Sequence, residues 1–345
     1  MAAQDRWNHR SVKAQQAWDK LPKKANGDIN WGSIRVAHLD TGYTRHAAFG
    51  AWSAAGGNGI LETPGKDFFQ PSRPSAQDPL TPVTAPQEVG HGTRTSAVLA
   101  GRSAAGDFLG VAPGLPLVPY RINNDSLILQ EAAFAIGAAI TDIVKEGRCQ
   151  VVSISQGFPF VLDKAMGRAV DKAYLNGIII CCAAGQFIDR VCYPAKHRRT
   201  IGVGGYRKSG RQYQKYDRYG RIDSWAPADN ITRPNVADLT TYSNDGDGTS
   251  YSTVHVSAAA AMWLRFHGAA IGQTYGNGAD DLWRRVEAFR LALRLSQRVL
   301  PFKVTPATHP GNSAGKLDIA NLLSVPLPPW DHLMREDDLA GDDEM

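Results

Sequence analysis

The chain has 345 residues, 43% of them hydrophobic and 21% charged, which describes a globular protein with one large α/β domain or two small ones. A net charge of +5 is too small to argue for nucleic-acid binding, and no apolar run is long enough to cross a membrane. Cys181 and Cys182 are adjacent inside an apolar run, and no CxxC pair occurs. These cysteines indicate buried thiols and no zinc site. Together with a polar N-terminus that lacks a signal core, they predict a cytoplasmic location.

A strand and a histidine-bearing turn are predicted in the N-terminal third. The β-branched run Ser33–Asp40 ends in an acid, at the edge where parallel strands of open α/β sheets place their sites. The plainer alternative is that Asp40 caps a turn. Residues 50–86 are rich in Gly, Ser, Pro and Ala and predict a surface loop or a series of turns. His91 follows between two glycines, immediately before a predicted helix over Thr93–Leu99, and is a candidate catalytic base.

The middle of the chain alternates buried strands with helices. We predict a turn and strand over 110–122, a helix over 130–147, a strand over 149–155, a helix over 161–176, and strands over 178–185 and 200–206. These spacings mean right-handed crossovers and a mostly parallel sheet with both faces covered. We therefore predict one domain over 1–334, with an N-terminal segment 1–30 leading into it, and an acidic, disordered tail over 335–345.

Basic residues gather in three places: Lys196–Arg199, Tyr206–Arg221 and Trp283–Arg298. The last segment is predicted to form an amphipathic helix with its apolar residues near one face. We expect its arginines to face solvent; affinity for an acidic partner is the lesser alternative.

Ser250 stands at the start of a predicted buried helix in the stretch Gly246–Leu264. A turn of small residues is followed there by an alanine-rich run free of Gly and Pro. A hydroxyl at a helix start lies in a positive field near N–H groups without intrahelical partners. A nucleophile whose target becomes an oxyanion needs that environment, whereas the plainer alternative is a helix N-cap.

Asp40, His91 and Ser250 form a combination with a chemical purpose. A serine hydroxyl is a poor nucleophile until a neutral imidazole removes its proton. A buried carboxylate that accepts the other imidazole N–H fixes the required tautomer. The order Asp, His, Ser along the chain is that of subtilisin, not that of chymotrypsin or the α/β-hydrolases.

The chain resembles the subtilisin-like serine peptidases (subtilases, peptidase family S8). VAHLDTGY, GHGTRTSAVLAG and GTSYSTVHVSAAAAM are similar to that family's Asp, His and Ser motifs. Other matching segments occur in the correct order: GVAPGLPLVPYRI, VVSISQG, CYPAKHRRTIGVGG, SWAPADNI and GKLDIANLL. The resemblance extends over roughly residues 18–323 and makes a purely structural role for the three residues improbable.

The resemblance implies a three-layer α/β/α fold with a mostly parallel sheet and endopeptidase activity through an acyl-enzyme. Ser250 is then the nucleophile, His91 the general base and later acid, and Asp40 its orienter. Substrate main chain is expected to bind as an added strand along two edges, with Cys192 near the base of the pocket between them. Those edges are formed by Ser155, Gln156, Gly157, Ala183, Ala184 and Gly185. The resemblance also implies a cis bond between Tyr193 and Pro194.

Three departures from the family pattern bear on function. Gln186 stands where the family has an Asn whose amide donates to the oxyanion, so the longer side chain must fold back to reach the same point. Ser252 and Val254 replace an Ala and a Pro in the Ser motif, and Cys192 replaces a common Gly, which shortens the pocket. Ser250 keeps its backbone N–H as the other oxyanion donor.

The resemblance also raises the question of calcium. The loop after the His helix, GRSAAGDFLG, lacks the family's oxygen ligands apart from the candidate Asp107, so we expect no cofactor and no calcium there. A calcium site elsewhere stays open.

Our leading hypothesis is an intracellular endopeptidase with a restricted protein or peptide substrate. The main alternative is an impaired pseudo-peptidase that binds peptides, suggested by Gln186, and a third is an esterase. The sequence leaves the oligomeric state open.

Overall fold

The computed structural model describes residues 4–52, 59–80, 89–125, 130–157, 163–216, 221–300 and 314–336. A seven-stranded sheet forms the centre of the molecule, in the order β2-β3-β1-β4-β5-β6-β7, and every neighbouring pair is parallel. Its strands are β1 (Val36–Asp40), β2 (Lys66–Asp67), β3 (Leu117–Arg121), β4 (Val151–Ile154), β5 (Ile179–Ala183), β6 (Ile201–Tyr206) and β7 (Ser224–Pro227).

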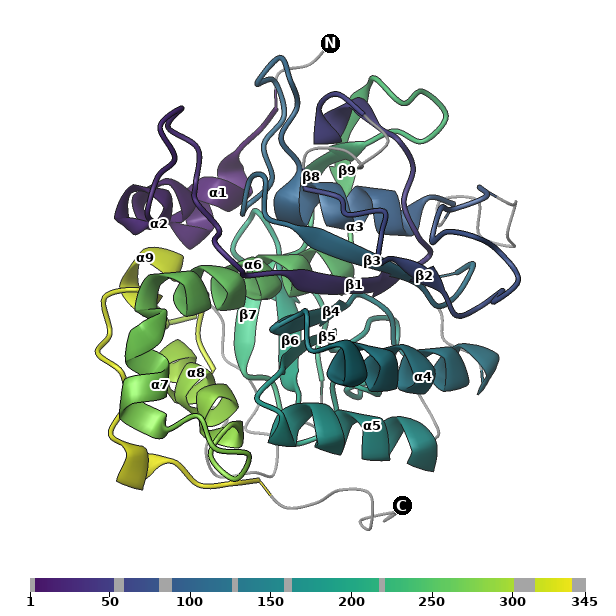
Figure 1. The fold of residues 1–345 in the computed structure, drawn as a ribbon. Helices are drawn as coiled ribbons and strands as arrows, with labels where there is room; N and C mark the ends of the chain where they lie inside the picture. The colour runs from purple at the N-terminus through teal and green to yellow at the C-terminus, as the bar shows by residue number, and fades with distance from the viewer. Residues whose placement is uncertain are drawn as a thin grey trace.

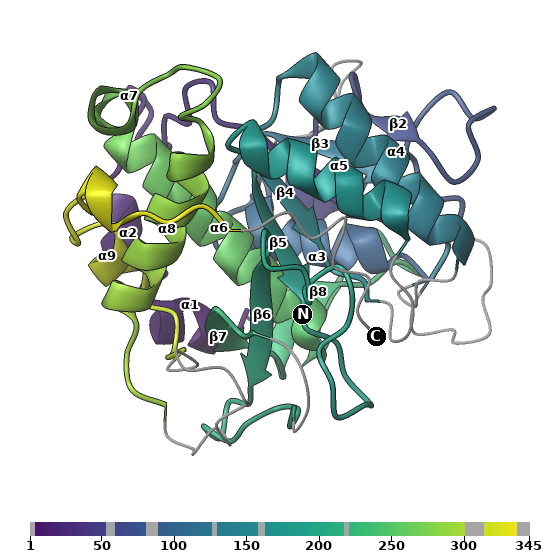
Figure 2. The same ribbon diagram turned by 90° about the horizontal axis from the view of Figure 1, so that it is seen from below.

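Helices cover both faces of this sheet (Figures 1 and 2). On one face α6 (Thr249–His267) packs on β4, β5, β6 and β7, with α3 (His91–Ala100) beside it against β1. On the other face α4 (Gln130–Glu146) contacts β1, and α5 (Lys164–Leu175) contacts β5. The strands in the middle are buried on both sides, which explains their continuous apolar sequences. The predicted three-layer α/β/α fold is confirmed.

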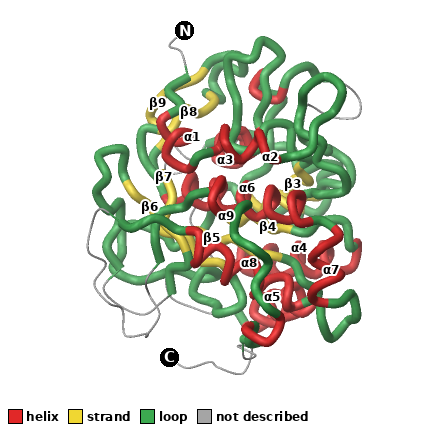
Figure 3. The backbone as a smooth tube through the Cα atoms, turned by 90° about the vertical axis from the view of Figure 1, so that its left-hand side faces the viewer, coloured by secondary structure: helices red, strands yellow, loops and turns green. Residues whose placement is uncertain are grey.

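The remaining elements surround these three layers. The short antiparallel pair β8–β9 contacts α3 and lies outside the central sheet (Figure 3). The C-terminal helices α7, α8 and α9 gather near α6 (Figure 2). Their bounds are α1 (Trp7–Val12), α2 (Ala14–Lys20), β8 (Ile231–Pro234), β9 (Tyr242–Gly246), α7 (Ala269–Tyr275), α8 (Trp283–Ser296) and α9 (Ile319–Leu322), with 3₁₀ turns at Ala47–Phe49 and Trp330–His332. No helix in the described ranges is long and apolar enough to span a bilayer.

One prediction for α8 is wrong, because its arginines do not all face solvent. Arg290 is only 4% exposed and donates to Asp223, Glu287 and two backbone carbonyls. Arg285 donates to the carbonyl of Gly177. A buried guanidinium is tolerated because carboxylates on both sides compensate its desolvation. Val299 lies beyond the end of α8 and is 92% exposed.

The acidic tail predicted from residue 335 begins in contact with the domain. The Glu336 carbonyl accepts from Arg199, its carboxylate pairs with Arg221, and its N–H donates to Tyr174. The rest of the predicted tail, 337–345, lies outside the described residues, as does the start of the helix predicted from residue 161.

Candidate active site

The structure brings together the three residues singled out from the sequence, one from each of three elements. Asp40 ends β1, His91 begins α3, and Ser250 lies in the first turn of α6. His91 Nδ1 is 2.7 Å from Asp40 Oδ1, and His91 Nε2 is 3.1 Å from Ser250 Oγ. Both distances are hydrogen-bond lengths, so a carboxylate, an imidazole and a hydroxyl form one continuous chain.

Asp40 is fully buried and heavily hydrogen-bonded. Its Oδ1 accepts from the backbone N–H of Thr41 at 2.7 Å, and its Oδ2 accepts from the Thr95 hydroxyl at 3.1 Å. Burial alone would raise the pKa of Asp40, but the charge and hydrogen bond of His91 hold it below the ordinary value. Asp40 is therefore an ionised acceptor that fixes the proton of His91 on Nδ1.

The glycines on each side of His91 allow the backbone there to pack closely against other segments of the chain. A Cβ on Gly92 would lie 2.1 Å from the carbonyl oxygen of Gly42, in the turn that follows Asp40. Gly90 has φ +74°, and a Cβ there would lie 2.3 Å from Val236. The GHG sequence is thus required by packing, since a side chain at Gly92 would push His91 away from β1.

Ser250 does not cap its helix, so the plainer alternative fails. The N-cap position is Gly248, with φ 138°, and the helix begins at Thr249. Ser250 Oγ donates to the carbonyl of Ser155 at 2.8 Å and lies within reach of His91 Nε2. Because a hydroxyl has one proton, it must turn from Ser155 to His91 before Ser250 can attack a substrate.

Gln186 lies beside the start of α6. Its Oε1 accepts from the backbone N–H of Thr249 at 3.0 Å. This bond fixes which end of the amide is the carbonyl, so Nε2 is left as the donor next to the nucleophile turn. The longer Gln side chain therefore keeps an oriented amide beside Ser250.

The two predicted substrate-binding edges face each other across Cys192. These edges are Ser155–Gly157, after β4, and Ala183–Gly185, at the end of β5. A Cβ on Gly157 would lie 3.0 Å from Cys192 Cβ, and one on Gly185 would lie 2.4 Å from Cys192 Sγ. Cys192 is 5% exposed, and its side chain occupies the space between the edges. Its peptide neighbour, the Tyr193–Pro194 bond, is cis, as the resemblance implied.

Two residues near the site, Tyr216 and His38, gave no signal in the sequence, and the predicted Gln156 turns its side chain in an unexpected direction. The Tyr216 hydroxyl donates to the carbonyl of Gly185 at 2.6 Å, although the sequence marked its segment only as basic. Gln156 is 1% exposed, and its Nε2 is 3.5 Å from Asp40 Oδ1. The side chain of Gln156 thus turns toward Asp40, and only its backbone is left for substrate. His38, two residues before Asp40, is also buried beside it.

Two residues of the Ser motif, the altered Ser252 and the histidine His255, serve packing. Ser252 Oγ donates to the carbonyls of Ala226 and Pro227 and so ties α6 to β7. His255 Nδ1 donates to the Tyr251 carbonyl at 2.6 Å, which leaves Nε2 to accept from Asn8. Burial lowers the pKa of His255 to about 4, so this neutral imidazole is structural.

The loop after α3 is closed by its own hydrogen bonds. Ser103 Oγ donates to Asp107 Oδ1 at 2.5 Å, and Phe108 N–H donates to Ser103 Oγ. The Gln4 amide donates to the carbonyl of Leu109 and accepts from its N–H. Among the described residues no group of three or more His, Cys, Asp or Glu side chains is arranged to hold a metal ion. Asp107, the candidate calcium ligand, is thus already bonded to Ser103.

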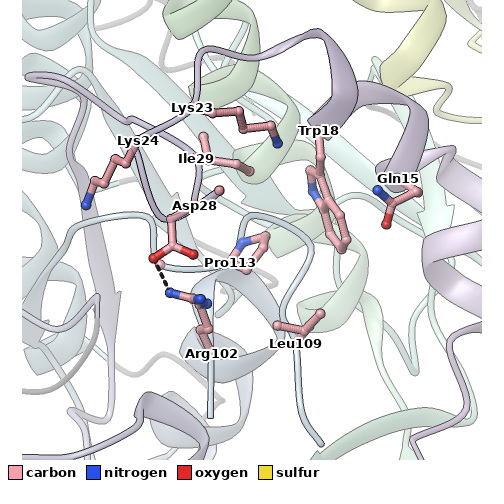
Figure 4. Close-up of a pocket in the computed structure, with 11 residues that line it drawn as sticks. Gln15, Trp18, Lys23, Lys24, Asp28, Ile29, Arg102, Leu109 and Pro113 are labelled. Carbon is pink, nitrogen blue, oxygen red and sulfur yellow. Dashed lines mark hydrogen bonds and ion pairs between the residues drawn. The ribbon is translucent and has the colours of Figure 1, made fainter. Parts of the chain in front are cut away.

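A pocket of about 210 Å³ lies away from the Asp40–His91–Ser250 chain (Figure 4). The ion-paired side chains of Arg102 and Asp28 line it, together with Trp18 and Pro113. Arg102 follows the last turn of α3, whereas His91 begins that helix, so about 15 Å of helix separates the pocket from the imidazole. The pocket and the candidate active site are separate features.

Comparisons with known proteins bear on the family to which the chain is similar. A model of the subtilase family matches residues 32–275. The major intracellular serine protease of Bacillus subtilis (strain 168) is 25% identical over 338 residues, covering 91% of this chain and 91% of that protein. A putative subtilase-type proteinase of sexual differentiation in Schizosaccharomyces pombe, isp6, is 28% identical over 260 residues, covering 70% of this chain and 52% of that protein.

Solved structures share the fold at low sequence identity. A protease of Pseudoalteromonas arctica superposes with a TM-score of 0.68 at 20% identity, covering 91% of this chain and 93% of that one. MycP1 with its N-terminal propeptide removed superposes with a TM-score of 0.65 at 18% identity, covering 94% and 99% of the two chains. At these identities the likeness concerns the fold.

Proposed function

Because the chain belongs to the subtilase family of serine endopeptidases, we propose that it hydrolyses peptide bonds through an acyl-enzyme on Ser250. His91 acts as the general base and Asp40 as its orienter. The observation that carries this proposal is the chain of hydrogen bonds from Asp40 through His91 to Ser250, at 2.7 and 3.1 Å. Each distance lies within the reach that proton transfer requires.

In the proposed reaction His91 first accepts a proton from Ser250 and then donates it to the leaving group. Ser250 Oγ attacks the scissile carbonyl as His91 Nε2 takes its proton, and the developing oxyanion accepts from the Ser250 N–H and the Gln186 amide. His91 then gives the proton to the leaving amine. A water molecule then attacks the acyl-enzyme as His91 takes its proton. His91 returns that proton to Ser250 Oγ, and the carboxylic acid product leaves.

Labelling with a fluorophosphonate tests the proposal, with intact mass and peptide mapping as the readout. We expect one label per chain, on Ser250, and none on Ser250→Ala. Ser252→Ala is the matched control, since it removes a hydroxyl from the same helix turn that faces β7 instead of His91. It should be labelled like the native protein.

The labelling experiment, combined with assays on ester and amide substrates, separates the competing functions. A folded protein that is not labelled contradicts the proposal and favours a pseudo-peptidase that only binds peptides. A labelled protein that hydrolyses ester but not amide substrates favours the esterase. Hydrolysis of both supports the endopeptidase.

We also propose a restricted substrate that binds in extended form and places a small residue before the scissile bond. Cys192 supports this restriction because its side chain fills the space between Gly157 and Gly185. A methylene group in a pocket is worth about 10–200-fold in discrimination, so a filled pocket disfavours Leu or Phe strongly.

Replacing Cys192 by Gly should therefore change specificity. We expect kcat/KM for peptides with Leu or Phe before the scissile bond to rise at least about 10-fold relative to peptides with Ala there. The measurement is a competition between such peptides, read by mass spectrometry. Cys149→Ala, at another buried free thiol, is the control and should leave the ratio unchanged. An unchanged ratio in Cys192→Gly would place the restriction elsewhere.

We propose that the protein works in a reducing compartment and needs no calcium at the loop after α3. The four cysteines are free and buried, and the Bacillus relative carries an intracellular name, which supports the first statement. The bonds of Ser103 and Gln4 support the second. We expect EDTA to leave the thermal midpoint and the labelling rate unchanged. A lower midpoint that calcium restores in the native protein but not in Asp107→Asn would place calcium at this loop and contradict the proposal.

A further inference from the structure

His38 lies beside the candidate triad but belongs to none of the roles assigned so far. It is two residues before Asp40 on β1, so the two side chains project from the same face of the strand. Its side chain is 2% exposed, and its Nε2 lies 3.1 Å from Thr95 Oγ1 and 3.8 Å from Asp40 Oδ2. A buried imidazole thus lies next to the Asp40 carboxylate, on the side of Oδ2.

The direction of these hydrogen bonds follows from proton counting. Thr95 Oγ1 has one proton and lies 3.1 Å from Asp40 Oδ2, 3.1 Å from the His91 carbonyl and 3.3 Å from the Gly92 carbonyl. Asp40 is ionised, and a bond to a charged acceptor is about twice as strong as a neutral one, so the proton goes to Asp40. The Thr95 oxygen must then accept from His38, which places the His38 proton on Nε2.

We infer that His38 and Thr95 form a relay that positions Asp40, in which His38 Nε2–H donates to Thr95 and Thr95 donates to Asp40 Oδ2. The relay turns the second carboxylate oxygen away from His91, while Oδ1 faces the imidazole. His38 and Thr95 are positioning residues, because neither is in contact with Ser250. This inference rests on the proposed function, since Asp40 matters only if His91 acts as a base.

His38 is an uncharged member of the relay. The pKa of His38 is lowered to about 4, mainly by burial; the charge of Asp40 opposes this shift and that of His91 adds to it. These two groups, Asp40 on the same strand and His91 on α3, are the charged neighbours that act on it. At neutral pH His38 is therefore a neutral donor.

Kinetics of Thr95→Val tests the relay, because this change removes the hydroxyl and keeps the shape. A hydrogen bond to a charged group contributes enough for about a 10-fold loss of kcat, with KM unchanged. Ser96→Ala is the matched control, since the Ser96 hydroxyl bonds to the carbonyls of Gly92 and Thr93 and not to Asp40. We expect His38→Leu to lose as much kcat as Thr95→Val. The double variant should lose no more than either single variant. His38→Gln should keep most of the native kcat, because its amide N–H is able to donate to Thr95.

The pH profile adds a readout that a merely structural role would not move. Without the Thr95 bond, Asp40 directs more of its charge at His91 and favours its protonated form. The acid limb of kcat/KM should then shift to higher pH in Thr95→Val and His38→Leu. Additive losses in the double variant, or an unmoved acid limb, would overturn the relay.

A measurement without turnover separates this inference from the proposed function. NMR of ¹⁵N-histidine-labelled protein at neutral pH should show His38 as the Nε2–H tautomer. An Nδ1–H tautomer overturns the relay even if the protein is an active peptidase. If the native protein is neither labelled nor active but shows the Nε2–H tautomer, the proposed function fails and the hydrogen-bond geometry stands.

Discussion

Replacing Asp40 by alanine is expected to lower kcat by about 10⁴-fold without unfolding the protein. The variant loses the acceptor for His91 Nδ1–H, which lies 2.7 Å away, so the imidazole is free to rotate and to adopt the wrong tautomer. It also loses the charge that stabilises the imidazolium. The measurement is kcat and KM on a cleaved peptide, with the thermal midpoint as a check of folding.

Asp40→Asn separates orientation from charge. The Thr41 N–H and His91 Nδ1 both point at Oδ1, whereas Oδ2 faces the Thr95 hydroxyl, which is able to rotate. An asparagine therefore keeps its carbonyl at the Oδ1 position and its NH₂ toward Thr95. We expect its loss of kcat to be smaller than that of Asp40→Ala. Equal losses would mean that the amide has turned its NH₂ toward His91.

Both Asp40 variants should also shift the acid limb of kcat/KM to lower pH. The carboxylate favours the protonated imidazole, so without it His91 loses its proton at a lower pH. Asp78→Asn is the matched control: Asp78 accepts from the Thr41 hydroxyl at 2.7 Å but does not touch His91. It should leave both kcat and the acid limb nearly unchanged. A loss in Asp78→Asn as large as in Asp40→Ala would contradict the assigned roles.

The sequence was most informative where burial and local geometry act on neighbouring residues. The apolar runs around β1, β4, β5 and β6 predict these strands to within three residues, because strands covered on both faces carry few polar side chains. The glycines around His91 and Ser250 likewise reflect close backbone approaches that are visible in motifs. Short strands such as β7 and β8 were missed, since four residues with a proline give no periodic signal.

Features that depend on distant partners could not be read from the sequence. Arg290 looked like part of a solvated helix face, but its partner Asp223 is 67 residues away in the chain. His38 gave no signal within its strand, and its proposed role is visible only with Thr95 and Asp40 around it. The motif identifies Gln186 as a departure from the family, but only the bond to Thr249 shows how the longer side chain is oriented.

Removing the amide of Gln186 should reduce kcat by about 10²–10³-fold in Gln186→Ala, with little change in KM. The oxyanion develops only as Ser250 attacks, so a lost donor there weakens the transition state and not the bound substrate. The rate of fluorophosphonate labelling should fall as well. The measurement is kcat and KM, with peptide mapping of the label on Ser250.

Two further variants distinguish donation from packing at this position. Gln186→Glu keeps the acceptor for the Thr249 N–H and nearly the same shape, but it replaces the NH₂ donor by a charge that repels an oxyanion. It should be at least as impaired as Gln186→Ala. Gln186→Asn is shorter by one methylene, so it either reaches the oxyanion or holds Thr249, and we expect intermediate activity. If Gln186→Glu retained native kcat, the amide would only pack against α6, and the Ser250 N–H would be the main support of the oxyanion.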